Sequence, residues 1–111
     1  MPERRSVQVT VNGRAAHSSM AHLGVNAITY ASRLIGELER IEQDLKDRHP
    51  DPRFTPAYPT LQVTLIEGGT ATNIIPVTAS FGFEVRALPG VDPRAIEDRL
   101  RRFSEAKCLP E

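Results

Sequence analysis

The pattern that most constrains the fold is a stripe of apolar residues at helical spacing between residues 25 and 48. The opposite side of this segment is charged, so the pattern predicts one long amphipathic helix. The helix must end by His49, because Pro50 and Pro52 follow and proline disfavours helical geometry in the residue before it. The apolar members of the stripe are Ile28, Ala31, Leu34, Ile35, Leu38, Ile41 and Leu45. We therefore expect a helix that covers an apolar surface made by the rest of the chain.

Three segments, at residues 6–12, 61–66 and 77–88, alternate between apolar and polar residues in the manner of strands. The residues expected on the core face are Val7, Val9 and Val11 in the first segment, Leu61, Val63 and Leu65 in the second, and Val77, Ala79, Phe81, Phe83 and Val85 in the third. The outward face of the third strand is expected to carry Thr78, Ser80, Gly82, Glu84 and Arg86. Between the second and third strands, residues 68–76 are predicted to be irregular.

A second helix is predicted after the third strand. Asp92 has the character of an N-cap, Pro93 suits the first helical position, and the helix is expected to reach about residue 105. Its core-facing residues are predicted to be Ile96, Leu100 and Phe103. The order β-α-β-β-α predicts an α+β two-layer sandwich, with an antiparallel sheet and both helices on one face. A ferredoxin-like fold has a further strand after the second helix, so we expect one domain over residues 6–105 whose last strand is truncated.

The charge balance argues against the simplest nucleic-acid binders. The 111 residues include 14 Lys+Arg and 14 Asp+Glu, so no basic excess is available to attract a phosphate backbone. No apolar run approaches the length of a membrane span, and the first residues lack an apolar signal region. The single cysteine, Cys108, cannot form an internal disulfide, which favours a reducing compartment. We therefore expect a cytoplasmic domain that binds neither nucleic acid nor membrane.

The first candidate site residue is a histidine in the loop before the long helix, where residues 13–28 read GRAAHSSMAHLGVNAI. His17 is either an ordinary loop histidine bonded to backbone or a proton donor at the rim of the sheet. No evident nucleophile or base accompanies it, so a catalytic His17 would need partners on another polypeptide. His22 and His49 have no ligand-spaced neighbours, and we interpret both as surface residues. The sequence predicts no metal site.

The other candidates lie in the loop before the third strand and near the end of that strand. Gly68 and Gly69 indicate positive φ or a close approach of backbone to another group, and Asn73 follows in the same loop. This loop is either a tight turn or a ligand-facing surface on which the amide donates and accepts. Arg86 is either solvated or clamps a carboxylate. The strand at 61–66 has the character of an edge that pairs with a second copy.

Together these motifs resemble one family. GRAAHSSMAHLGVNAI before a long helix, then GGTATNIIP, then FEVRALPG, is similar to the lid or dimerization domain of certain zinc-dependent amidohydrolases. That family includes acetylornithine deacetylase, succinyl-diaminopimelate desuccinylase, carboxypeptidase G and the aminoacylases. The segments AAHSS and GVNAI most resemble the acetylornithine deacetylase branch of the family. The resemblance runs from about residue 6 to residue 105.

The resemblance implies a function shared between domains and subunits. It implies a ferredoxin-like lid inserted in a catalytic domain that holds two zinc ions, and a homodimer formed through the strand at 61–66 and the helix at 25–48. His17 matches a histidine that reaches into the other subunit's active site and stabilises an oxyanion. Arg86 matches an arginine that binds a carboxylate of a small N-acyl amino acid. Asn73 and Gly69 match substrate-side residues, and the zinc ligands are absent, so this part alone should be inactive.

Two other classes of protein share the predicted topology. A nucleic-acid-binding domain would place aromatic residues on the open face of the sheet, whereas Phe81 and Phe83 are assigned to the core. A small regulatory ligand-binding domain would use Gly68, Gly69 and Asn73 to line an interface pocket.

Overall fold

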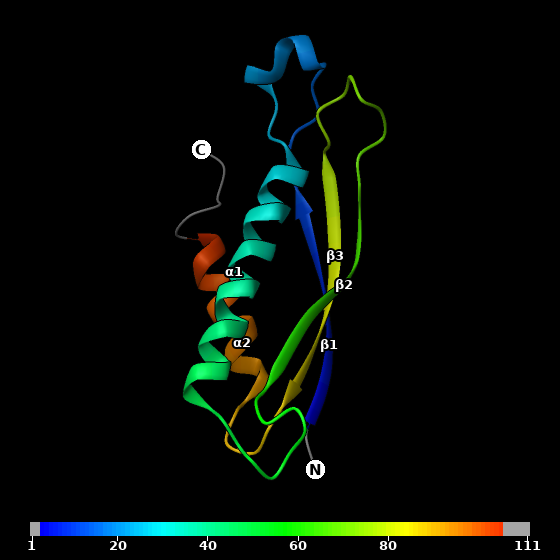
Figure 1. Ribbon diagram of the computed structural model, residues 1–111. Coiled ribbons are helices and arrows are strands. Elements are labelled where there is room, and N and C mark those ends of the chain that lie inside the picture. Colours follow the sequence, from blue (N-terminus) through cyan, green and yellow to red (C-terminus); the bar gives the residue numbers. More distant parts are fainter. Residues whose placement is uncertain (1–2, 106–111) are drawn as a thin grey trace.

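The computed structural model describes residues 3–105 and places a three-stranded sheet beside two α-helices (Figure 1). A short 3-10 helix precedes the first of them. The elements are β1 (Glu3–Asn12), the 3-10 helix η1 (Ser18–Leu23), α1 (Ala27–Arg48), β2 (Thr60–Gly68), β3 (Thr78–Ala87) and α2 (Pro93–Phe103). Within these residues, no helix combines the length and apolar character that crossing a bilayer requires. The predicted order β-α-β-β-α is confirmed, while η1 was expected to be loop.

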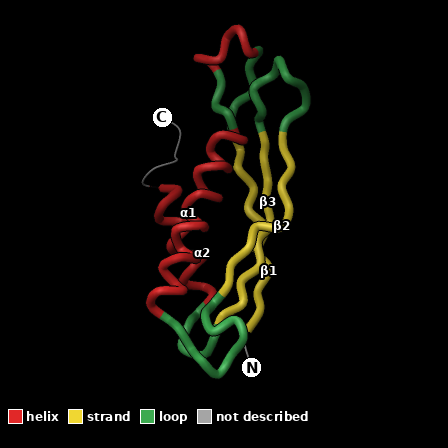
Figure 2. The backbone as a smooth tube through the Cα atoms, in the orientation of Figure 1, coloured by secondary structure: helices red, strands yellow, loops and turns green. Residues whose placement is uncertain are grey.

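The sheet has the order β1-β3-β2, and both pairings are antiparallel. Figure 2 shows both helices on one side of this sheet, which leaves its other face uncovered by helix. The predicted α+β architecture is therefore confirmed. Because β3 lies in the middle, β1 and β2 each have one free edge within the described part of the chain.

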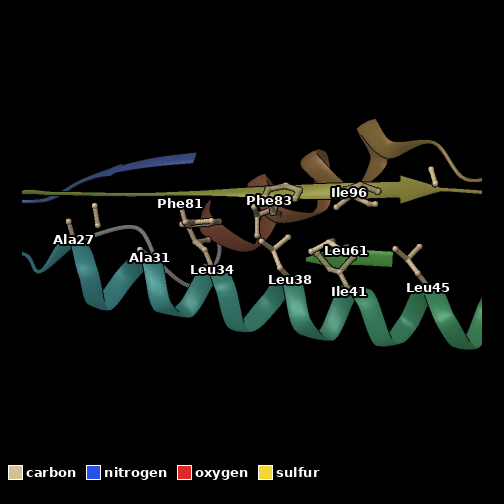
Figure 3. Packing of buried hydrophobic residues seen from close by; sticks show 14 residues of the cluster. Ala27, Ala31, Leu34, Leu38, Ile41, Leu45, Leu61, Phe81, Phe83 and Ile96 are labelled. Atoms are coloured by element: carbon tan, nitrogen blue, oxygen red, sulfur yellow. The ribbon is translucent and has the colours of Figure 1, made fainter. Parts of the chain in front are cut away.

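The core lies between α1 and β3 along the length of the molecule (Figure 3). The side chains of Phe81 and Phe83 are 1% and 2% exposed, and their ring centroids lie 6.5 Å apart. Facing them, α1 buries Ala27, Ala31, Leu34, Leu38, Ile41 and Leu45. From α2, Ile96 and Leu100 complete the cluster. These residues are the ones that helical and alternating periodicity predicted, with Ala27 added.

Both α-helices begin at capping residues. The Asn26 side chain accepts a hydrogen bond from the Thr29 N–H at 3.1 Å, which satisfies a free donor at the start of α1. At α2, the Asp92 carboxylate accepts from the Arg94 N–H at 2.9 Å and Pro93 takes the first helical position, as predicted. The predicted helix at 25–48 starts two residues later than expected, at Ala27. The second helix is α-helical to Phe103 and continues as π-helix through Ser104 and Glu105, which agrees with the predicted end at about residue 105.

Three residues predicted to face the core are exposed instead. Leu65 is 69% exposed because the register of β2 shifts between Val63 and Leu65, which turns the following side chains over. Val77 is 47% exposed because it precedes β3, which starts at Thr78. Ile28 is 39% exposed because it lies beside the buried row of α1, against Gly68 and Gly69.

Candidate functional site

Two loops are joined by backbone hydrogen bonds at the end of the molecule drawn uppermost in Figure 1. The first loop connects β1 to α1, and the second connects β2 to β3. Gly13 N–H donates to the Val77 carbonyl at 2.7 Å, and Ile75 N–H donates to the Ala16 carbonyl at 2.6 Å. We call these joined segments, residues 13–26 and 69–77, the loop end. The pairing holds exposed side chains in place without a large apolar core.

His17 is exposed in the loop end and caps η1 with its ring. Its Nδ1 accepts the backbone N–H of Ser19 at 3.1 Å and lies 2.8 Å from the Ser19 hydroxyl. A nitrogen that accepts a hydrogen bond carries no proton, so the neutral ring holds its proton on Nε2. Within the described residues, Nε2 makes no hydrogen bond. The structure thus presents His17 as a donor through Nε2.

Sequence reasoning did not find the role of Ser19. The residue that caps η1 is His17, whose ring accepts the Ser19 backbone N–H. The two-residue separation of His17 and Ser19 could have indicated this contact, since a side-chain acceptor two residues before a free backbone N–H is a common local motif. Because Nδ1 is already occupied by the Ser19 backbone, the contact with the Ser19 hydroxyl orients the ring and does not form an activated nucleophile.

Asn73 and Gly69 lie in the same loop end as His17. The Asn73 carbonyl accepts from the Ser18 N–H at 2.8 Å, and His17 pairs with Ile74 in an isolated antiparallel bridge. The Asn73 side chain is exposed. Gly69 has φ of +86°, a left-handed conformation that other residues adopt at a cost in free energy. The conformation of this turn is therefore enough to explain why position 69 is glycine. The structure therefore brings His17 and Asn73 together.

Arg86 lies at the other end of β3, far from this pair. Its Nη1 donates to the Pro56 and Tyr58 carbonyls at 3.3 and 3.4 Å, and its guanidinium carbon lies 6.0 Å from the centre of the Phe54 ring. These contacts hold the guanidinium at the proline-rich loop between α1 and β2, and among residues 3–105 they engage one of its nitrogens. Within one copy of the chain, Arg86 and His17 do not form one site.

A zinc site does not fit the described residues. No three His, Cys, Asp or Glu residues among positions 3–105 come together in a way that could hold a metal ion. His22 and His49 are both exposed, as expected for surface histidines. Any zinc ligands of a larger protein would therefore have to come from outside this part of the chain.

Comparison with known proteins identifies the family. A family model described as "Peptidase dimerisation domain" matches residues 4–111. The chain belongs to the peptidase dimerisation domains of the M20 family. This dimerisation domain is 34% identical over 92 residues to acetylornithine deacetylase of Proteus mirabilis, a match covering 83% of the chain and 24% of that protein. It is 33% identical over 98 residues to acetylornithine deacetylase of Myxococcus xanthus, covering 88% and 26%.

Solved structures agree on the fold of this dimerisation domain. Aminopeptidase PepT from Bacillus cereus is 27% identical, with a TM-score of 0.62 over 95% of this chain and 24% of that one. A putative aminohydrolase from methicillin-resistant Staphylococcus aureus is 23% identical, with a TM-score of 0.72 over 95% and 26%. The chain spans about a quarter of the length of the curated relatives it matches.

Proposed function

We propose that this dimerisation domain is also the substrate lid of a zinc-dependent N-acyl-amino-acid amidohydrolase of the acetylornithine deacetylase kind. Two matches to acetylornithine deacetylases, at 34% and 33% identity over 83% and 88% of the chain, support this enzyme type over the peptidases with the same fold. The two zinc ions and the general base belong to a catalytic domain outside residues 3–105, so this domain by itself is inactive. We further propose that the enzyme works in the cytoplasm.

The single observation that carries the proposal is the hydrogen bond that the Ser19 N–H donates to Nδ1 of His17. With Nδ1 occupied by Ser19, the ring offers an Nε2–H donor on an exposed loop. When an N-acyl group is attacked, its carbonyl oxygen gains negative charge, and a preorganised N–H donor stabilises that oxygen. As the resemblance of the His17 motif implies, we propose that His17 acts in the active site of the other subunit.

The two ends of the domain suit different parts of one substrate. Arg86 is held by carbonyl oxygens through one nitrogen, which leaves donors for a carboxylate. Asn73 lies beside His17 and offers an amide that donates and accepts. Because the two ends are separated by the length of β3, we propose that His17 and Asn73 come from one subunit and Arg86 from the other. Gly69 shapes the loop end that approaches the substrate.

A His17→Ala variant of the full-length enzyme tests the proposal. Loss of one oxyanion donor is expected to lower kcat by about 10²–10³-fold, with the zinc content and the dimer unchanged. His22→Ala is the matched control, because His22 is exposed in the same loop end and makes no side-chain hydrogen bond among the described residues. A His17→Ala enzyme with nearly normal kcat would remove the catalytic role.

The alternatives gain no support from the site. The open face of β1 and β3 presents polar residues, whereas Phe81 and Phe83 are buried on the other face, so no aromatic platform for bases is available there. A regulatory ligand-binding role would need amino-acid binding by this domain alone, which calorimetry with N-acetylornithine and free amino acids would detect.

A further inference from the structure

The face of β3 opposite the helices carries an arginine, Arg86, whose charge no carboxylate among residues 3–105 balances. In the register of the sheet, Arg86 lies between Arg4 on β1 and Thr60 on β2. Like charges directly opposite each other on neighbouring strands repel. Glu84 balances Arg4, because its Oε1 lies 3.4 Å from the Arg4 Nη1. Within the described residues, Arg86 makes no salt bridge, so its positive charge is available to an anion from elsewhere.

Arg86 is held instead by the proline-rich loop, residues 49–59. The Pro56 and Tyr58 carbonyls accept hydrogen bonds from its Nη1 at 3.3 and 3.4 Å. The guanidinium carbon lies 6.0 Å from the centre of the Phe54 ring, within the range of a cation–π interaction. The carbonyls limit rotation of the guanidinium within its own plane, and the ring limits its tilt. The guanidinium is therefore held by neutral groups that leave its charge in place.

The loop that supplies these contacts is itself held by hydrogen bonds. The Asp51 carboxylate accepts from the Arg53 Nε at 2.9 Å and from its Nη2 at 2.6 Å, and the Asp51 N–H donates to the Ala57 carbonyl at 2.6 Å. The hydrogen bond from the Arg53 side chain lowers the pKa of Asp51 to about 2, so the ion pair persists at neutral pH. The Phe54 N–H donates to the Asp51 carbonyl at 3.2 Å, and the Arg53 guanidinium carbon lies 5.7 Å from the centre of the Phe54 ring. The ring is therefore presented by an ordered turn.

We propose that Phe54 is a positioning residue, which holds the Arg86 guanidinium in the orientation that binds the substrate carboxylate. This rests on the proposed function, in which Arg86 binds that carboxylate. Among the described residues, the Nε and Nη2 atoms of Arg86 make no hydrogen bond, and they form an edge whose N–H groups a carboxylate accepts side by side. A guanidinium that is already oriented loses less freedom when the carboxylate binds. Phe54 thus raises the affinity for the substrate through Arg86.

Steady-state kinetics of the full-length enzyme test this role with two substrates, an N-acyl amino acid and its α-carboxamide, which has no carboxylate. Phe54→Leu should raise KM for the carboxylate substrate about 2–5-fold, the fold-change expected from losing one exposed cation–π interaction. Its kcat and the kcat/KM of the carboxamide should not change. Phe54→Tyr keeps the ring and should retain the wild-type KM. Phe103→Leu is the matched control, because that ring lies 5.6 Å from the guanidinium carbon of a different arginine, Arg40.

A double-mutant cycle separates positioning from a general role in the fold. In an Arg86→Ala background, Phe54→Leu should have no further effect on kcat/KM for the carboxylate substrate, because the ring acts only through the guanidinium. A loss that persists in this background, or one that affects both substrates equally, would show that Phe54 supports the fold alone. Either result would overturn the proposal.

The outcomes also separate this inference from the function on which it rests. If Arg86→Ala reduces the preference for carboxylate over carboxamide and Phe54→Leu does not, the positioning role is wrong and the proposed role of Arg86 stands. If Arg86→Ala leaves the preference unchanged, Arg86 does not bind the carboxylate and both proposals fail. If Phe54→Leu does not fold, Asp51→Ala gives the same test, because it releases the Arg53 side chain and loosens the turn that carries the ring. An unchanged preference in that variant would overturn the positioning role.

Discussion

Two variants that are inactive alone, His17→Ala and Arg86→Ala, are expected to restore activity when they assemble into one mixed dimer. In such a dimer, one active site receives the intact His17 of the Arg86→Ala subunit and the intact Arg86 of the His17→Ala subunit. The other site lacks both groups. A mixed dimer should therefore show about half the wild-type kcat, because one of its two symmetry-related sites is complete.

The expectation follows from the length of β3. Eight residue steps separate Thr78, beside the loop end, from Arg86, and at about 3.3 Å per residue they span about 26 Å. A substrate as long as three extended residues spans only about 10 Å. One copy of the chain therefore cannot present His17 and Arg86 to the same small molecule. Complementation is the direct consequence of dividing the two groups between subunits.

The assay uses two differently tagged subunits that are refolded together and purified by both tags in sequence. Hydrolysis of an N-acyl amino acid is measured for the mixed dimer and for each parent. The His17→Ala parent should fall by about 10²–10³-fold in kcat, the scale expected for losing one oxyanion donor, and the Arg86→Ala parent should lose kcat/KM because the substrate carboxylate loses its guanidinium partner. A mixed dimer no more active than its parents would refute the division, because it would mean that one subunit supplies both groups of a site or that neither contributes.

Three further predictions concern the ring, the core and acid stability. Ser19→Ala should leave the His17 ring less fixed, so the NMR shifts of its ring nitrogens should move toward a mixture of tautomers; unchanged shifts would show that the backbone N–H suffices. Leu38→Ala, at a fully buried position, should lower the free energy of unfolding by about 2–5 kcal/mol in urea titrations, and a loss below 1 kcal/mol would contradict the packing. A hydrogen bond from Arg99 holds the pKa of Asp44 below its usual value. Its contribution to folding stability is therefore present above the unfolded-state pKa and is lost as pH falls through the folded-state pKa. Asp44→Asn should flatten the fall of the melting temperature at acid pH, and an unchanged fall would contradict this.

Periodicity predicted the layered fold because each buried face is long and regular. The alternation of β3, which includes Phe81 and Phe83, persists over several residue pairs, and the apolar stripe of α1, which includes Leu38, persists over several turns. In both elements the local pattern and the tertiary packing therefore agree. The prediction that Leu65 faces the core was wrong, because alternation in the sequence does not reveal a β-bulge. One inserted residue shifts the register of β2, and nothing in LQVTLI marks where such a shift occurs.

The candidate site shows the same contrast between features that neighbouring residues in the sequence determine and features that depend on tertiary structure. The sequence picked out His17 and Asn73, but the proximity of the two depends on backbone bonds between loops more than 50 residues apart. The family resemblance grouped Arg86 with these two residues. The course of β3 in the structure shows that Arg86 lies at the end of the strand away from them. A motif whose members lie at opposite ends of one strand cannot converge within one copy. If the motif describes one site, the chain must supply that site as a dimer, which is the structural reason that a dimerisation domain would carry catalytic residues.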